Sequence, residues 1–96
     1  MRRARRMHRQ GKPRKAAVAL RELAARTEEP AHWVALGHAL GQARREDEAV
    51  VALRQGMWLH QQRGADARAR TVARLILDID PSDRKAERYV AMAAAA

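Results

Sequence analysis

Residues 33–53 read WVALGHALGQARREDEAVVAL, and this stretch decides how the rest of the chain is interpreted. Its first half places Trp33, Leu36 and Leu40 at the three- and four-residue spacing of one helix face. A charged segment, residues 44–47, then interrupts the apolar pattern, and its acidic side chains suit the positive N-terminal end of a following helix. The stretch therefore predicts two helices joined by a short turn, over residues 31–43 and 46–63.

The composition of the 96-residue chain favours a single all-α domain. Hydrophobic residues make up 47% but aromatic residues only 3%, and phenylalanine and cysteine are absent. Alanine and leucine supply the apolar content, which suits closely packed helices better than a sheet that needs β-branched and aromatic faces. Without cysteine the fold cannot depend on disulfides, and thiol chemistry is excluded. We expect one domain with a small helical core.

The flanking segments also read as helices. Gly11 and Pro13 mark a helix stop and a helix start, which predicts one helix over residues 1–10 and another over roughly residues 13–27. After the stop at Gly64 the helical pattern resumes, and Ser82 and Asp83 are placed to cap a last helix. The predicted architecture is six antiparallel helices in about three stacked pairs, over residues 1–29, 30–63 and 64–96.

The central pair resembles the tetratricopeptide repeat, whose pattern is W-x2-L-G-x2-Y, then A-x3-F, then P, over 34 residues. Trp33, Leu36 and Gly37 match the first helix of the pattern, and Ala49 matches the small residue of the second. Three positions depart from the family: Leu40 replaces tyrosine, Leu53 replaces phenylalanine and Gln61 replaces proline. The resemblance implies a short right-handed solenoid in which Gly37 lets the neighbouring helix approach closely.

The resemblance weakens toward both ends of the chain. In a slightly truncated first repeat the pattern positions fall on Ala4, Met7, Ala16 and Leu20. In the third pair Ala69, Ala73 and Ile76, followed by Pro81, resemble the second half of the pattern, although their order in the chain makes that helix the first of its pair. The truncated start is compatible with a complete protein and with a fragment of a longer array.

Membership of this family would imply a protein-binding groove. The first helix of each tetratricopeptide pair lines a concave surface that holds a peptide or a partner helix. Chaperone-binding members of the family carry lysine and asparagine at two positions of this surface. This chain has Val34 and His38 there, so we do not predict that it binds chaperones. An acidic or amphipathic protein segment would suit the groove. Its predicted lining residues are Arg5, His8, Arg9, Val34, His38, Gly41 and Gln42.

The N-terminal segment offers an alternative function from a different class. Residues 1–15 carry eight arginine and lysine side chains and no acidic residue, out of a formal net charge of +9 for the chain. Such a segment can bind nucleic acid electrostatically, and its candidate phosphate contacts are Arg2, Arg3, Arg6 and Lys12. It lacks the aromatic residues that stack on bases, and no base-reading motif accompanies it. Contact with an anionic membrane surface is a third, weaker hypothesis.

Nothing in the sequence indicates catalysis or export. His32 and His38 are six residues apart and therefore on different helix faces, unlike the i, i+4 pair of a metal-binding helix. Phosphate-binding glycine loops and nucleophile motifs are absent. No apolar run has the length of a signal-peptide core or a membrane span. We expect a cytoplasmic protein with no enzymatic activity, no cofactor and no bound metal.

The sequence leaves open whether Val51 and Trp58 are buried or exposed. They share a helix face that lies one residue away from the apolar stripe of Leu53 and Met57. The favoured interpretation is that they pack on the following helix, since long helices in stacked pairs touch neighbours on two sides. Exposure of the two side chains would instead indicate self-association into a homo-oligomer.

Overall fold

The computed structural model describes residues 13–95, and every regular element within them is an α-helix. The predicted all-α fold is therefore confirmed. The described helices are α2 (Pro13–Thr27), α3 (Pro30–Gln42), α4 (Glu46–Gln62), α5 (Asp66–Ile79) and α6 (Arg84–Ala95). The first of the six predicted helices, over residues 1–10, lies outside the described residues. The same holds for the site candidates Arg2, Arg3, Arg5, Arg6, His8, Arg9 and Lys12.

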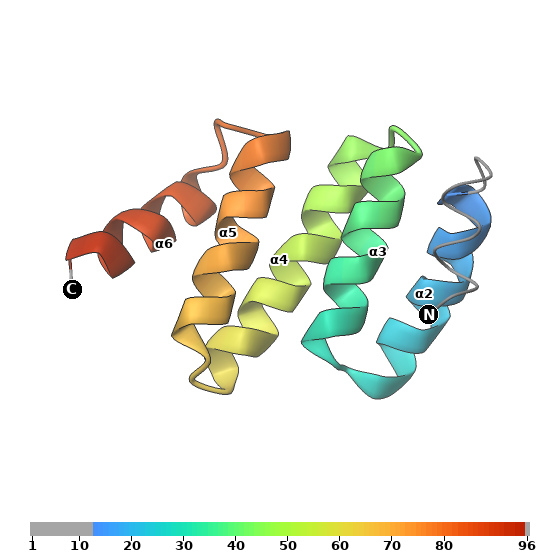
Figure 1. Cartoon of the computed structure of the whole chain (residues 1–96), viewed down its shortest axis with the longest axis horizontal. Coiled ribbons are helices and arrows are strands. Elements are labelled where there is room, and N and C mark those ends of the chain that lie inside the picture. The colour runs from blue at the N-terminus through green and yellow to red at the C-terminus, as the bar shows by residue number, and fades with distance from the viewer. Residues whose placement is uncertain (1–12, 96) are drawn as a thin grey trace.

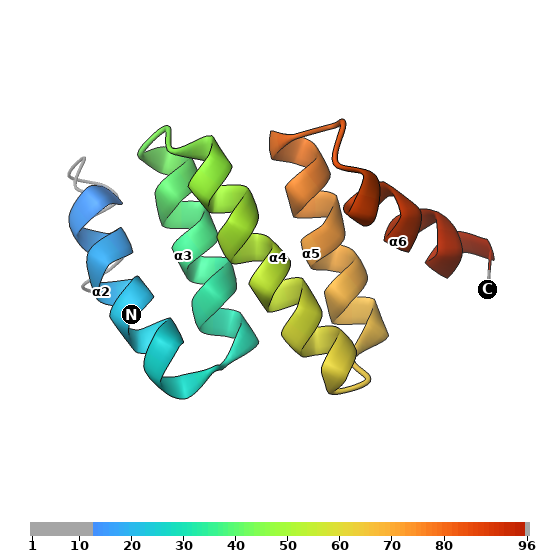
Figure 2. The same cartoon turned by 180° about the vertical axis from the view of Figure 1, so that it is seen from behind.

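The helices lie side by side in chain order along the long axis of the molecule (Figures 1 and 2). Each packs mainly against its neighbours in sequence, and α6 leans away from α5 toward its C-terminal end. The molecule extends 42 Å along its longest axis and 18 Å along its shortest. Because the helices form a row, the central helix α4 has a neighbour on each side.

Three turns reverse the chain through a single residue in the left-handed region. These residues are Glu28 (φ 53°), Arg44 (φ 61°) and Gly64 (φ 70°). After Arg44 the backbone NH of Arg45 donates to the carbonyl of Leu40 at 2.9 Å, which satisfies a carbonyl that the helix end leaves free. Only Gly64 could be recognised as a helix stop by its residue type, because glycine alone adopts this conformation without steric cost.

Two clusters of buried side chains form the core, and α4 contributes to both. One joins α2, α3 and α4 through Ala16, Ala17, Leu20, Leu36, Ala39, Leu40, Ala49 and Ala52. The other joins α4, α5 and α6 through Val50, Leu53, Met57, Ala69, Val72, Ala73, Ile76 and Ala86. Two faces of α4 are thus covered by neighbouring helices.

Glycines allow the close approach of α3 and α4. A Cβ atom added to Gly37 would lie 2.6 Å from Leu53 Cγ, so the predicted close contact at this glycine is confirmed. Gly56 of α4 makes a second close contact, because its added Cβ would lie 3.1 Å from Val34 Cγ2 and 3.3 Å from the Pro30 carbonyl oxygen. Gly41 differs, since a Cβ there would meet nothing within 4 Å.

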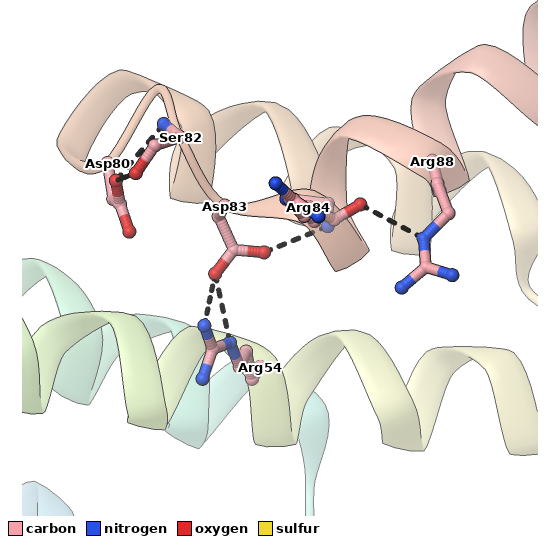
Figure 3. A network of polar contacts seen from close by, with 7 residues as sticks. Arg54, Asp80, Ser82, Asp83, Arg84 and Arg88 are labelled. Carbon is pink, nitrogen blue, oxygen red and sulfur yellow. Dashed lines mark hydrogen bonds and ion pairs between the residues drawn. The ribbon is translucent and has the colours of Figure 1, made fainter.

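Asp83 fixes the start of α6 and ties it to α4 (Figure 3). Its Oδ1 accepts a 2.9 Å hydrogen bond from the Ala86 backbone NH, as an N-cap does, and its Oδ2 accepts one from Arg54 Nε at 3.1 Å. Arg54 Nη2 forms an ion pair with the same oxygen. The predicted capping by Asp83 is confirmed. Ser82 has another role, because its hydroxyl donates to Asp80 Oδ1 at 2.6 Å.

The carboxyl group of Asp83 is almost fully buried, with 1% of its side chain exposed. Burial disfavours the charged form, but the hydrogen bond from Ala86 and the bond and charge of Arg54 outweigh it. The pKa of Asp83 is therefore lower than its usual value of 3.8. Asp83 stays ionised at neutral pH, so the link between α4 and α6 is a charged one.

Candidate protein-interaction surface

The exposed residues of α4 lie in one stripe. Beyond its first residue, the exposed positions of this helix are Asp47, Val51, Arg54, Trp58 and Gln62. Their spacings of four, three, four and four residues keep them on one face. The other α4 residues are buried or half-buried, because α3 and α5 cover the remaining faces. We refer to these five residues as the α4 stripe.

Two large apolar side chains lie in the α4 stripe. Val51 is 63% exposed and Trp58 51% exposed. The favoured prediction, that they pack on the following helix, is wrong, and the alternative that they are exposed is correct. The following helix α5 packs against the α4 face of Val50 and Met57, which precede Val51 and Trp58 by one residue each. One residue turns a helix by about 100°, so the two side chains point away from that contact.

Three surface hollows adjoin the α4 stripe, and Val51 lines all of them. The acidic hollow, of about 470 Å³, lies at the N-terminal end of α4 and is lined by Glu46, Asp47, Val50, Val51, Arg54, Ile79 and Asp80. The basic hollow, of about 570 Å³, lies between α4 and α6 and is lined by Val51, Arg54, Gln55, Met57, Trp58, Gln61 and Lys85. The third hollow, of about 400 Å³, reaches Arg21 of α2 and Trp33 of α3.

The first two hollows carry opposite charge. Glu46, Asp47 and Asp80 bring three carboxylates to the acidic hollow. Lys85 brings an ammonium group to the basic hollow, which no acidic side chain lines. Arg54 borders both, but its charge is balanced by Asp83. The surface along α4 therefore runs from a negative end, past Val51 and Trp58, to a positive end.

Four of the predicted groove residues belong to α3 and lie along one side of that helix: Val34, His38, Gly41 and Gln42. His38 and Gln42 are exposed, whereas Val34 and Gly41 are half-buried. Val34 packs against the second core cluster. None of the four lines the three hollows beside α4, so the predicted groove and the hollowed surface involve different residues. Their binding role stays a prediction.

Two of the three described histidines, His32 and His60, have surroundings that the structure defines. His32 Nδ1 is 2.7 Å from the Thr27 hydroxyl, where it ties α3 to the end of α2. Burial, and then the charges of Arg68 and Arg63, lower the pKa of His60 from its usual value of 6.5. Within residues 13–95, no group of three or more histidine, aspartate and glutamate side chains is placed to hold a metal ion.

Comparison with known proteins adds no family assignment. No protein-family model matches the chain, and neither does any curated protein. The resemblance to the tetratricopeptide repeat therefore depends on the residues of the chain itself. None of the helices in the described part of the chain has the length and apolar character needed to cross a membrane.

The sequence alone could predict only part of the surface along the α4 stripe. The shared face of Val51 and Trp58 could be recognised from their seven-residue separation. The acidic and basic hollows beside them could not, because they are formed with Asp80 and Lys85, which lie more than 20 residues further along the chain.

Proposed function

We propose that this chain is a non-catalytic protein-interaction module of the tetratricopeptide type, and that it binds an amphipathic helix along the α4 stripe. The observation that carries the proposal is the half-exposed Trp58, beside a hollow and on the same face as Val51. Tryptophan is among the residues most enriched at the energetic centres of protein interfaces. Leaving Val51 and Trp58 in water, on a helix whose other large apolar side chains are buried, has no benefit for the isolated fold.

The spacing of the stripe supports a helix as the ligand. Positions separated by four, three and four residues form the seam by which one helix packs on another. Val51 and Trp58 would supply the apolar contacts of this seam, and the hollows on either side would receive side chains of the bound helix. The opposite charges at the two ends would fix its direction.

Site-specific photo-crosslinking in cells of the source organism tests this proposal. A photoreactive amino acid is placed at Val51 in one variant and at Val18 in another. Val18 is a matched control, because it is 61% exposed on α2 and lines none of the three hollows. We expect a discrete protein adduct from position 51 that disappears when Trp58→Ala is added, and none from position 18. Equal labelling from both positions, or no adduct from position 51, would contradict the proposal.

A further inference from the structure

We infer that the helix bound by the α4 stripe is α4 of a second copy of this chain, in antiparallel orientation. This inference rests on the proposed function, since it names the ligand of the same surface. A two-fold symmetric interface requires a surface that is complementary to itself after a half turn. The apolar and charged groups along α4 meet that requirement.

The apolar side chains of the two copies are complementary. Val51 and Trp58 are seven residues apart, or about 10 Å along the helix. A two-fold axis perpendicular to α4 and midway between them passes beside Arg54 and Gln55. Each Val51 then lies opposite the partner's Trp58, so the smaller of the two apolar side chains meets the larger one at both ends. Pairing of large with small side chains is how facing helices fill space.

The charges match under the same operation. The half turn brings the acidic hollow of one copy, with Glu46, Asp47 and Asp80, to the basic hollow of the other, with Lys85. None of Glu46, Asp47 and Lys85 has an ion-pair partner within residues 13–95. A parallel arrangement would instead place Asp47 against the partner's Asp47, and like charges across an interface disfavour association.

The two Arg54 side chains come close to the two-fold axis, where unbalanced like charges would oppose dimer formation. Each guanidinium is paired with Asp83 of its own chain, whose carboxylate is buried and ionised. The pair leaves little net charge at the axis. The link between α4 and α6 thus also prepares the centre of the interface.

Sedimentation velocity of the full chain, from micromolar to submillimolar concentration, tests the inference. We expect a concentration-dependent species of twice the 10.8 kDa chain mass. Trp58→Ala should raise the dissociation constant by at least about tenfold. Val18→Ala, an exposed apolar position outside the hollows, should leave it unchanged.

Charge reversal makes the test specific for the antiparallel arrangement. Asp47→Lys and Lys85→Glu should each weaken the homodimer, because both contacts then join like charges. An equimolar mixture of the two variants should recover most of the wild-type affinity as a heterodimer, since both contacts again join opposite charges. This recovery also shows that the variants are folded.

Three results would overturn the inference: a wild-type chain that stays monomeric, a dimer unaffected by Trp58→Ala, or a mixture that fails to associate. The proposed function can stand when this inference fails. If crosslinks from position 51 identify a different protein, the α4 stripe remains a binding surface and only the second copy is excluded as its ligand.

Discussion

Arg54 of α4 and Asp83 at the start of α6 are 29 residues apart in sequence, and they form an ion pair that joins the two helices. The carboxylate is buried, whereas 45% of the arginine side chain is exposed. The same carboxylate caps α6 through the Ala86 backbone NH. One side chain therefore determines both where the last helix begins and how it is held on α4.

Asp83→Ala should lower the free energy of unfolding by about 2–3 kcal/mol, because it removes a helix cap and a hydrogen bond to a charged group. Asp83→Asn should cost less, since an asparagine oxygen can still accept from Ala86. Urea unfolding of the two variants and the wild type measures the difference. Equal loss in both variants would mean that the ion pair, and not the cap, carries the stabilisation.

The low pKa of Asp83 predicts that the free energy of unfolding decreases at acidic pH. The folded state holds this carboxylate ionised more strongly than the unfolded state, so its contribution is present above the usual value of 3.8. It is lost as the pH falls below 3.8 through the lower folded-state pKa. Unfolding measured between pH 2 and pH 7 should show this loss in the wild type and a smaller one in Asp83→Asn. Parallel profiles for the two proteins would refute the assignment.

His60 predicts a second pH effect, at higher pH. Its pKa is lowered in the folded state, so the unfolded state binds the proton more tightly. Stability should therefore fall as the pH drops below the usual value of 6.5, and the decline should end at the folded-state pKa. His60→Gln should remove this part of the profile, and imidazole NMR shifts of the wild type should give the folded-state pKa directly. A midpoint at or above 6.5 would contradict the prediction.

Gly37 and Gly41 form a matched pair for testing helix packing. Gly37→Ala should lower the free energy of unfolding by about 1–3 kcal/mol, because the new methyl group collides with Leu53. Gly41→Ala should raise it by about 0.5 kcal/mol, since nothing occupies the space and alanine restricts the unfolded chain. Thermal unfolding of both variants distinguishes the two effects. Destabilisation by Gly41→Ala would show a packing role for Gly41 that the fold does not explain.

The electrostatic alternative, nucleic-acid binding through the N-terminal segment, has its own test. Labelled DNA and RNA are titrated with the full chain and with a chain lacking residues 1–12, the part of the segment that precedes α2. If the segment only attracts phosphates, binding should weaken steeply as salt rises toward physiological concentration. Tight binding that survives physiological salt and disappears with the segment would make nucleic acid the principal ligand.

The sequence predicted the helices well where residue types with strong local preferences mark their ends. Pro13 and Gly64 fixed the start of α2 and the end of α4, and the apolar spacing placed Ala49 and Leu53 in the core. The left-handed residues Glu28 and Arg44 have no such preference. At these two turns the charged or proline residues that follow gave the boundary.

The sequence predicted the close helix approach at Gly37 but not the other contacts between distant segments. The close approach of Gly56 to Pro30 and Val34 depends on how α3 and α4 cross, which spacing within one helix does not encode. The Arg54–Asp83 pair likewise depends on the placement of α6. Trp58 was misplaced because a helix with two neighbours has a wide apolar face, and one residue of rotation decides between core and surface.

Fluorescence quenching of Trp58 tests most directly the central claim, that a second copy covers the α4 stripe. In a Trp33→Phe variant Trp58 is the only tryptophan, and its accessibility to acrylamide is measured as the protein concentration is raised. We predict that quenching decreases as dimer forms, and that adding Lys85→Glu restores the strong quenching of an exposed indole. Quenching that stays strong and independent of concentration, up to submillimolar protein, would contradict the claim.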